Sequence, residues 1–114
     1  MVTTMRQIVI NELSADEAEK IHGYLKKTAK GASLEGAFWL ELPEELLGDA
    51  QMGHEQCGPF LFGIEAGEDF VNFELLVRSQ KNLHCSCTAY PTQEQRAFLL
   101  SKFDTMIADL EIKA

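Results

Sequence analysis

The stretch "PFLFGIEAGEDFVNFELLVRS", residues 59–79, decides the fold of this chain. On both sides of "AGED", apolar side chains occupy every second position, which is the pattern of two half-buried β-strands. A tight turn at Ala66–Asp69 would join them into an antiparallel hairpin with one apolar face. The side chains expected on that face are Phe60, Phe62, Ile64, Val71, Phe73, Leu75 and Val77.

Two amphipathic helices are predicted, one before and one after this hairpin. The first covers residues 15–30, where Ser14 and Glu17 have the spacing of a capping box at the start of a helix. The second covers residues 93–111, where Thr92 and Gln95 have the same spacing. Each helix carries one apolar stripe, so both are expected to pack on the sheet.

Further alternating segments predict strands at residues 5–13, 37–42 and 82–91, which gives the order strand, helix, four strands, helix. We therefore predict a single α+β domain over residues 1–114. Its architecture would be a two-layer sandwich of a mainly antiparallel five-stranded sheet with both helices on one face. The first strand joins either beside the second strand or at the far edge of the sheet, and the sequence does not choose between these positions.

The composition bears on partners and location. The chain has 114 residues, with 10 Lys and Arg against 18 Asp and Glu, a net charge of −8 that disfavours nucleic-acid binding. We find no apolar run of the roughly 20 residues that a membrane span requires, and no signal-peptide pattern at the N-terminus. Three cysteines make an odd number without the spacing of a disulfide framework, which favours a reducing, cytoplasmic location.

Two cysteines fall within the predicted strand 82–91, "NLHCSCTAYP". Residues two apart on a strand point to the same side, so Cys85 and Cys87 would share a face with Leu83 and Ala89 and be buried under the helices. On this interpretation His84 lies on the opposite face. We favour this core role for the cysteines, and we expect no metal and no cofactor.

A metal site is the alternative for the same residues. His54 and Cys57, in "MGHEQCG", have the spacing of half a zinc site, and Cys85 and Cys87 would supply two further thiolates. A redox or catalytic thiol is a third interpretation. It is disfavoured because a disulfide between positions i and i+2 of one flat strand is strained. No phosphate-binding loop, nucleophile elbow or zinc-protease motif is present, which favours a protein that is not an enzyme.

The sheet face away from the helices is the predicted interaction surface. A solvated face rarely holds so many large apolar side chains together, and aromatic residues beside arginine and histidine are typical of protein interfaces. The residues predicted to bind a partner are Trp39, Leu61, Phe70, Leu76, Arg78, His84 and Tyr90.

Our leading functional hypothesis is a small cytoplasmic binding or adaptor module without enzymatic activity. It would form a homodimer or dock a protein partner through this open face. The alternative is a small-molecule or metal-binding domain that uses the long connection at residues 43–58 with His54 and Cys57. A connection of that length in a compact domain is often functional.

Overall fold

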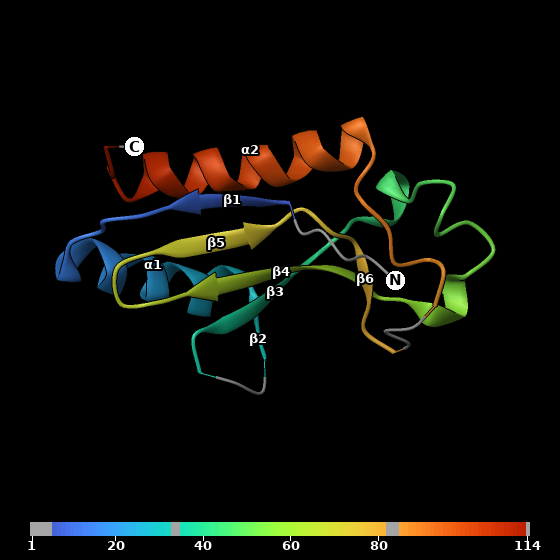
Figure 1. Ribbon diagram of the computed structural model, residues 1–114, viewed down its shortest axis with the longest axis horizontal. Helices are drawn as coiled ribbons and strands as arrows, with labels where there is room; N and C mark the ends of the chain where they lie inside the picture. Colours follow the sequence, from blue (N-terminus) through green and yellow to red (C-terminus); the bar gives the residue numbers. More distant parts are fainter. Residues whose placement is uncertain (1–5, 33–34, 82–84, 114) are drawn as a thin grey trace.

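The computed structural model describes residues 6–32, 35–81 and 85–113 of the chain. It shows an antiparallel sheet with two helices packed on it (Figure 1), which confirms the predicted α+β class. The elements are β1 (Gln7–Ile10), α1 (Ala15–Thr28), β2 (Lys30–Gly31), β3 (Ala37–Glu41), β4 (Phe60–Ala66), β5 (Val71–Glu74), β6 (Arg78–Ser79) and α2 (Gln93–Asp109), with 3₁₀ turns η1 (Glu44–Leu46) and η2 (Glu55–Cys57). The strand order is β1-β5-β4-β3-β2, and β6 pairs separately with β4.

The predicted hairpin forms the centre of the sheet. The Gly67 backbone N–H donates to the Phe70 carbonyl at 2.8 Å and closes the turn between β4 and β5. In the paired strands Ile64 lies opposite Phe73, and both side chains are buried. β1 lies at the far edge and pairs antiparallel with β5, which settles the position that the sequence left open.

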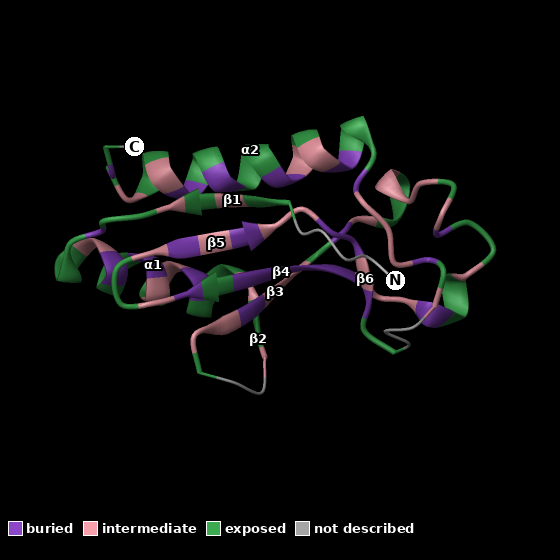
Figure 2. Cartoon of the chain, viewed as in Figure 1, coloured by how far each residue is buried: buried purple, intermediate pink, exposed green. Residues whose placement is uncertain are grey.

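Both predicted helices form, and each begins with its capping box. The Ser14 hydroxyl accepts from the Glu17 N–H, and the Thr92 hydroxyl accepts from the Gln95 N–H. The first helix ends earlier than predicted because the chain becomes extended at Ala29 and enters β2. Burial is concentrated on the central strands and on the sheet-facing sides of the helices (Figure 2).

The predicted strand at 82–91 is wrong where the structure describes it. Residues 85–88 form a turn, in which the Thr88 N–H donates to the Cys85 carbonyl, and Ala89 makes one isolated bridge to Val77. The last strand is instead the short β6, which pairs with the start of β4. Within the described residues, segment 85–91 has no partner strand beyond its one bridge to Val77, because Arg78 and Ser79 pair with β4 instead. Leu83 and His84 lie outside the described residues, so the predicted facing of His84 stays untested.

The predicted open face is also smaller than expected. Leu61 is 0% exposed and Leu76 is 3% exposed, so the prediction that they belong to an exposed patch is wrong. The chain after β5 turns back and places Arg78 opposite Leu61, which closes that end of the face. Trp39, Phe70, Arg78 and Tyr90 are half-buried, with part of each side chain open to solvent.

Among the described residues, no helix combines the length and the apolar composition needed to cross a membrane.

Candidate metal centre

His54 and Cys57 are placed side by side by the turn η2. This turn follows His54, and the Cys57 N–H donates to the His54 carbonyl at 2.8 Å. A 3₁₀ turn has three residues per turn, so side chains at i and i+3 project in nearly the same direction. In Figure 1 this segment lies at the end of the molecule opposite to the C-terminal end of α2.

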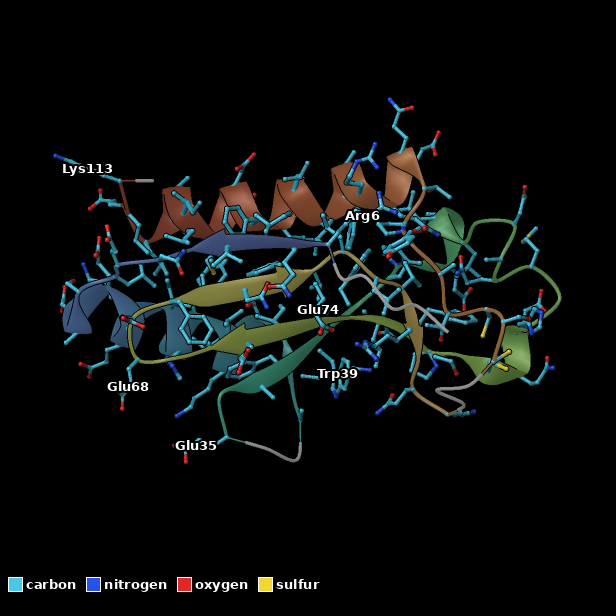
Figure 3. The ribbon with its side chains drawn as sticks, in the orientation of Figure 1. Arg6, Glu35, Trp39, Glu68, Glu74 and Lys113 are labelled. Atoms are coloured by element: carbon cyan, nitrogen blue, oxygen red, sulfur yellow. The ribbon has the colours of Figure 1, made fainter. Side chains whose placement is uncertain are left out.

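Cys85 and Cys87 reach the same place from the turn that replaces the predicted strand. The Cys57 and Cys85 sulfurs are 3.7 Å apart, although 28 residues separate the two cysteines in the sequence. The Cys85 sulfur lies 3.2 Å from Nδ1 of His54. One potential ligand atom from each of the four residues lies within 4.8 Å of all the others. Sulfur atoms gather beside η2 in Figure 3.

These distances suit a tetrahedral metal ion. With Zn–S bonds of about 2.3 Å and Zn–N bonds of about 2.0–2.1 Å, the ligand atoms of a tetrahedral zinc lie roughly 3.6–3.8 Å from one another. The Cys57–Cys85 sulfur distance of 3.7 Å lies in this range, and the distance of 3.2 Å between the Cys85 sulfur and His54 Nδ1 is slightly shorter. Small side-chain rotations would therefore bring the four atoms into a zinc coordination sphere.

Cys87 belongs to the hydrophobic core cluster and Cys85 packs against it, so the predicted core role agrees with the burial and packing of both cysteines. Cys57 and Cys87 are buried, and Cys85 is half-buried. All three are free thiols. They do not point from a regular strand into the helix layer, as predicted, but converge on one another and on His54.

The three thiols differ in acidity. A hydrogen bond from the Cys87 backbone N–H, which stabilises the thiolate, is the main cause that lowers the pKa of Cys85 to about 7. Burial raises the pKa of Cys87 to about 12, and burial also raises the pKa of Cys57. Cys85 is therefore the most readily deprotonated of the three thiols.

Buried polar side chains bond to the backbone of the two segments that carry the cluster, the η2 turn and residues 85–88, which we call the metal-site segments. The Ser79 hydroxyl donates to the Cys57 carbonyl at 2.5 Å, and Gln51 Nε2 donates to the Cys87 carbonyl at 2.8 Å. Gln51 Oε1 in turn accepts from the side chain of Gln95 at the start of α2. Sequence reasoning found Gln95 as a helix cap but missed Gln51 and Ser79, because no motif marks a polar side chain that bonds to a distant carbonyl.

The half-buried Trp39 belongs to a different part of the surface. It lies opposite Gly63 in the β3–β4 pair and lines a hollow of about 270 Å³ together with Asn72, Glu74 and Arg78. Arg78 and Glu74 form an ion pair at 3.2 Å. Within the described residues, Asn72 Oδ1 is buried and has no hydrogen-bond partner.

No family model matches this sequence, and the searches found no similar curated protein and no similar solved structure. The fold and the site together define a small α+β domain with a cluster of one histidine and three cysteines, and the functional proposal rests on the chemistry of that cluster.

Proposed function

We propose that this protein is a zinc-binding domain that holds one Zn²⁺ between His54, Cys57, Cys85 and Cys87. The observation that carries the proposal is the convergence of four soft ligand atoms from two distant segments within 4.8 Å. Thiolates and imidazole in a tetrahedral arrangement favour zinc among the metals available to proteins.

The site supports a structural role for the metal. Four protein ligands fill a tetrahedral coordination sphere and leave no position for substrate or water, whereas catalytic zinc sites keep one position open. The ion would join the long connection at 43–58 to the segment at 85–91. The free thiols fit a reducing compartment such as the cytoplasm.

The metal content of the untagged protein tests this proposal. We expect about one zinc per chain by elemental analysis after purification under reducing conditions. Cobalt added to the metal-free protein should give the intense near-ultraviolet band of a thiolate–cobalt bond and the visible bands of tetrahedral geometry. The variant Cys57→Ser should lose stoichiometric zinc.

Ser86→Ala is the matched control, because Ser86 lies between two of the ligands but is exposed and is not one of them. This variant should keep its zinc. A metal-free preparation that binds neither zinc nor cobalt when its thiols are reduced would contradict the proposal.

We also propose a second function, the docking of a protein partner on the open sheet face. The half-buried Trp39 favours it, because its indole lines a hollow on this face together with Asn72 and Arg78. A partner that covered the hollow would bury the rest of the indole. A second copy of this chain is the simplest such partner.

Trp39→Glu tests this second proposal. The change adds a charge on the face away from the helices, so the variant should stay folded by circular dichroism but lose self-association in sedimentation. Leu100→Glu, at an exposed position on α2, is the control for a charge added away from this face. A wild-type chain that is monomeric at high concentration, with a fully water-exposed indole fluorescence, would exclude the homodimer.

A further inference from the structure

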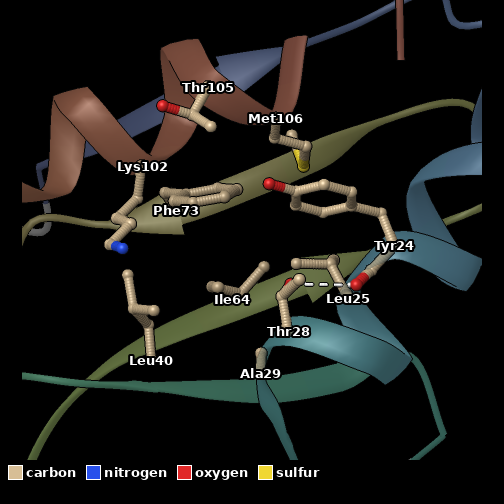
Figure 4. A pocket seen from close by; sticks show the side chains of 10 residues that line it. All are labelled: Tyr24, Leu25, Thr28, Ala29, Leu40, Ile64, Phe73, Lys102, Thr105 and Met106. Carbon is tan, nitrogen blue, oxygen red and sulfur yellow. Dashed lines mark hydrogen bonds between the residues drawn. The ribbon is translucent and has the colours of Figure 1, made fainter. Parts of the chain in front are cut away.

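A cleft opens between the two helices on the covered side of the sheet. It lies away from the metal-site cluster formed by His54, Cys57, Cys85 and Cys87. Its volume is about 130 Å³, and it is lined by residues of α1, α2, β3, β4 and β5 and by Ala29, which follows α1. Figure 4 shows side chains of the strands at its base and helix side chains on either side. The apolar residues that line it include Leu25, Ile64, Phe73 and Met106, all of which are buried.

The polar residues that line the cleft carry a single positive charge and no negative charge. Lys102 is the one charged residue among those that line it. The ion pairs within the described residues are Lys20–Asp16, Lys30–Glu41 and Arg78–Glu74, so Lys102 belongs to none of them. Its ammonium group lies 5.6 Å from the ring centre of Phe98. In a chain of net charge −8, a lysine without a carboxylate partner at the rim of an apolar cleft favours an anionic ligand.

Tyr24 limits where an anionic group of a ligand could bind in the cleft. In Figure 4 Tyr24 extends from α1 and Lys102 from α2 toward the same space over Phe73. The Tyr24 hydroxyl donates to Asp109 at 3.3 Å, which places a carboxylate near the Tyr24 side of the cleft. An anionic group is therefore favoured at the Lys102 side only.

The volume limits the apolar part of the ligand. An engineered apolar cavity of about 150 Å³ binds benzene. A cleft of 130 Å³ would therefore accept one six-membered ring or a short branched chain, but not a long acyl chain.

We propose that this cleft binds a small monocarboxylate with a compact apolar end. The apolar end would lie on Ile64 and Phe73, and the carboxylate would pair with Lys102. The cleft shares no residue with the metal-site cluster, so this site is independent of the proposed zinc function.

Titration of the ¹⁵N-labelled protein with benzoate, observed by NMR, tests the proposal. Saturable shifts are expected at the amides of Leu25, Ile64 and Phe73, with a dissociation constant on the order of 1 mM or tighter for a ligand of this size. Benzyl alcohol should bind more weakly because it has no charge, and benzylammonium should not bind detectably. 3-Methylbutanoate, in which a branched chain replaces the ring, should also bind.

Two variants separate charge from shape. Lys102→Met should weaken benzoate binding roughly two- to fivefold, the range of one exposed ion pair, and leave benzyl alcohol binding unchanged. Ala29→Leu should fill the cleft and abolish the binding of both benzoate and benzyl alcohol. Lys26→Met, which removes an exposed lysine that does not line the cleft, is the control and should bind benzoate as the wild type does. Absence of saturable shifts, equal binding of benzylammonium and benzoate, or unchanged binding by Ala29→Leu would overturn the proposal.

Discussion

A single buried amide, Gln51, connects the candidate metal centre to the second helix. Its Nε2 bonds to the Cys87 carbonyl, while its Oε1 accepts from Gln95 Nε2 and from the Gly48 N–H. The side chain is 1% exposed, so water cannot replace these bonds. In the proposed zinc site, Gln51 would therefore act as a positioning residue for Cys87.

Gln51→Leu should destabilise the protein by about 1–3 kcal/mol, because it leaves buried polar groups without partners. It should also weaken zinc binding, since the backbone carbonyl of Cys87 would lose its hydrogen bond from Gln51. Urea unfolding with zinc and with a chelator measures both effects. Gln56→Leu, at an exposed position of the same loop, should change neither, and equal behaviour of the two variants would count against a positioning role for Gln51.

Zinc affinity should fall steeply as the pH is lowered. With a pKa of about 7, Cys85 is half deprotonated near neutral pH, while Cys57 and Cys87 have raised pKa values and keep their protons. Binding must displace these protons, so the association constant should rise roughly 100-fold or more per pH unit between about pH 6 and pH 8. Competition with a chromophoric chelator at several pH values measures the slope. A flat profile would show that the thiols are not ligands.

The four ligands could be found in the sequence, but their arrangement could not. The spacing of His54 and Cys57 suggested half of a site, and the structure brings Cys85 and Cys87 to it. A spacing of two residues fits both a strand, where side chains share a face, and a turn, where they converge. A strand favours a core role for both cysteines, whereas the turn in the structure brings them beside Cys57 and His54.

At the scale of elements, the segments with local signals were predicted best. Both helices begin where their capping boxes place them, and the hairpin forms because its alternation and its turn agree. The segment after β5 has no comparable local signal. Its course depends on pairing with the start of β4 and on contacts with the η2 turn, and these are long-range interactions.

The two metal-site segments should open when the metal is removed, while the central hairpin stays closed. Chelation should speed amide exchange at Cys57, Gly58 and Thr88 by about tenfold or more, because their hydrogen bonds lie within the two small turns. The amide of Gly67, which closes the turn between β4 and β5, is the internal control. Hydrogen exchange observed by NMR measures both. Equal protection of the turns with and without chelator would argue against a metal that orders them.

For the whole molecule, the metal should act as a cross-link whose effect depends on free zinc. A ligand that binds only the folded state stabilises it by about 4 kcal/mol when its free concentration is a thousandfold above its dissociation constant. For a domain of this length that corresponds to a rise in Tm of about 15 °C. Thermal scans in zinc buffers should show Tm rising with the logarithm of free zinc. The same scans on Cys57→Ser should show no such rise, and a zinc-independent wild-type Tm would contradict the prediction.

The edges of the sheet have a consequence for aggregation. β1 offers four residues at one edge and β2 only two at the other, where Lys30 pairs with Glu41. Both edges are short within the described residues and the β2 edge is also charged, so they give a foreign strand little backbone with which to pair and limit growth into fibrils. They also make recognition by strand addition unfavourable. Any protein that binds this chain is therefore expected to contact side chains on a face of the sheet rather than extend the sheet itself.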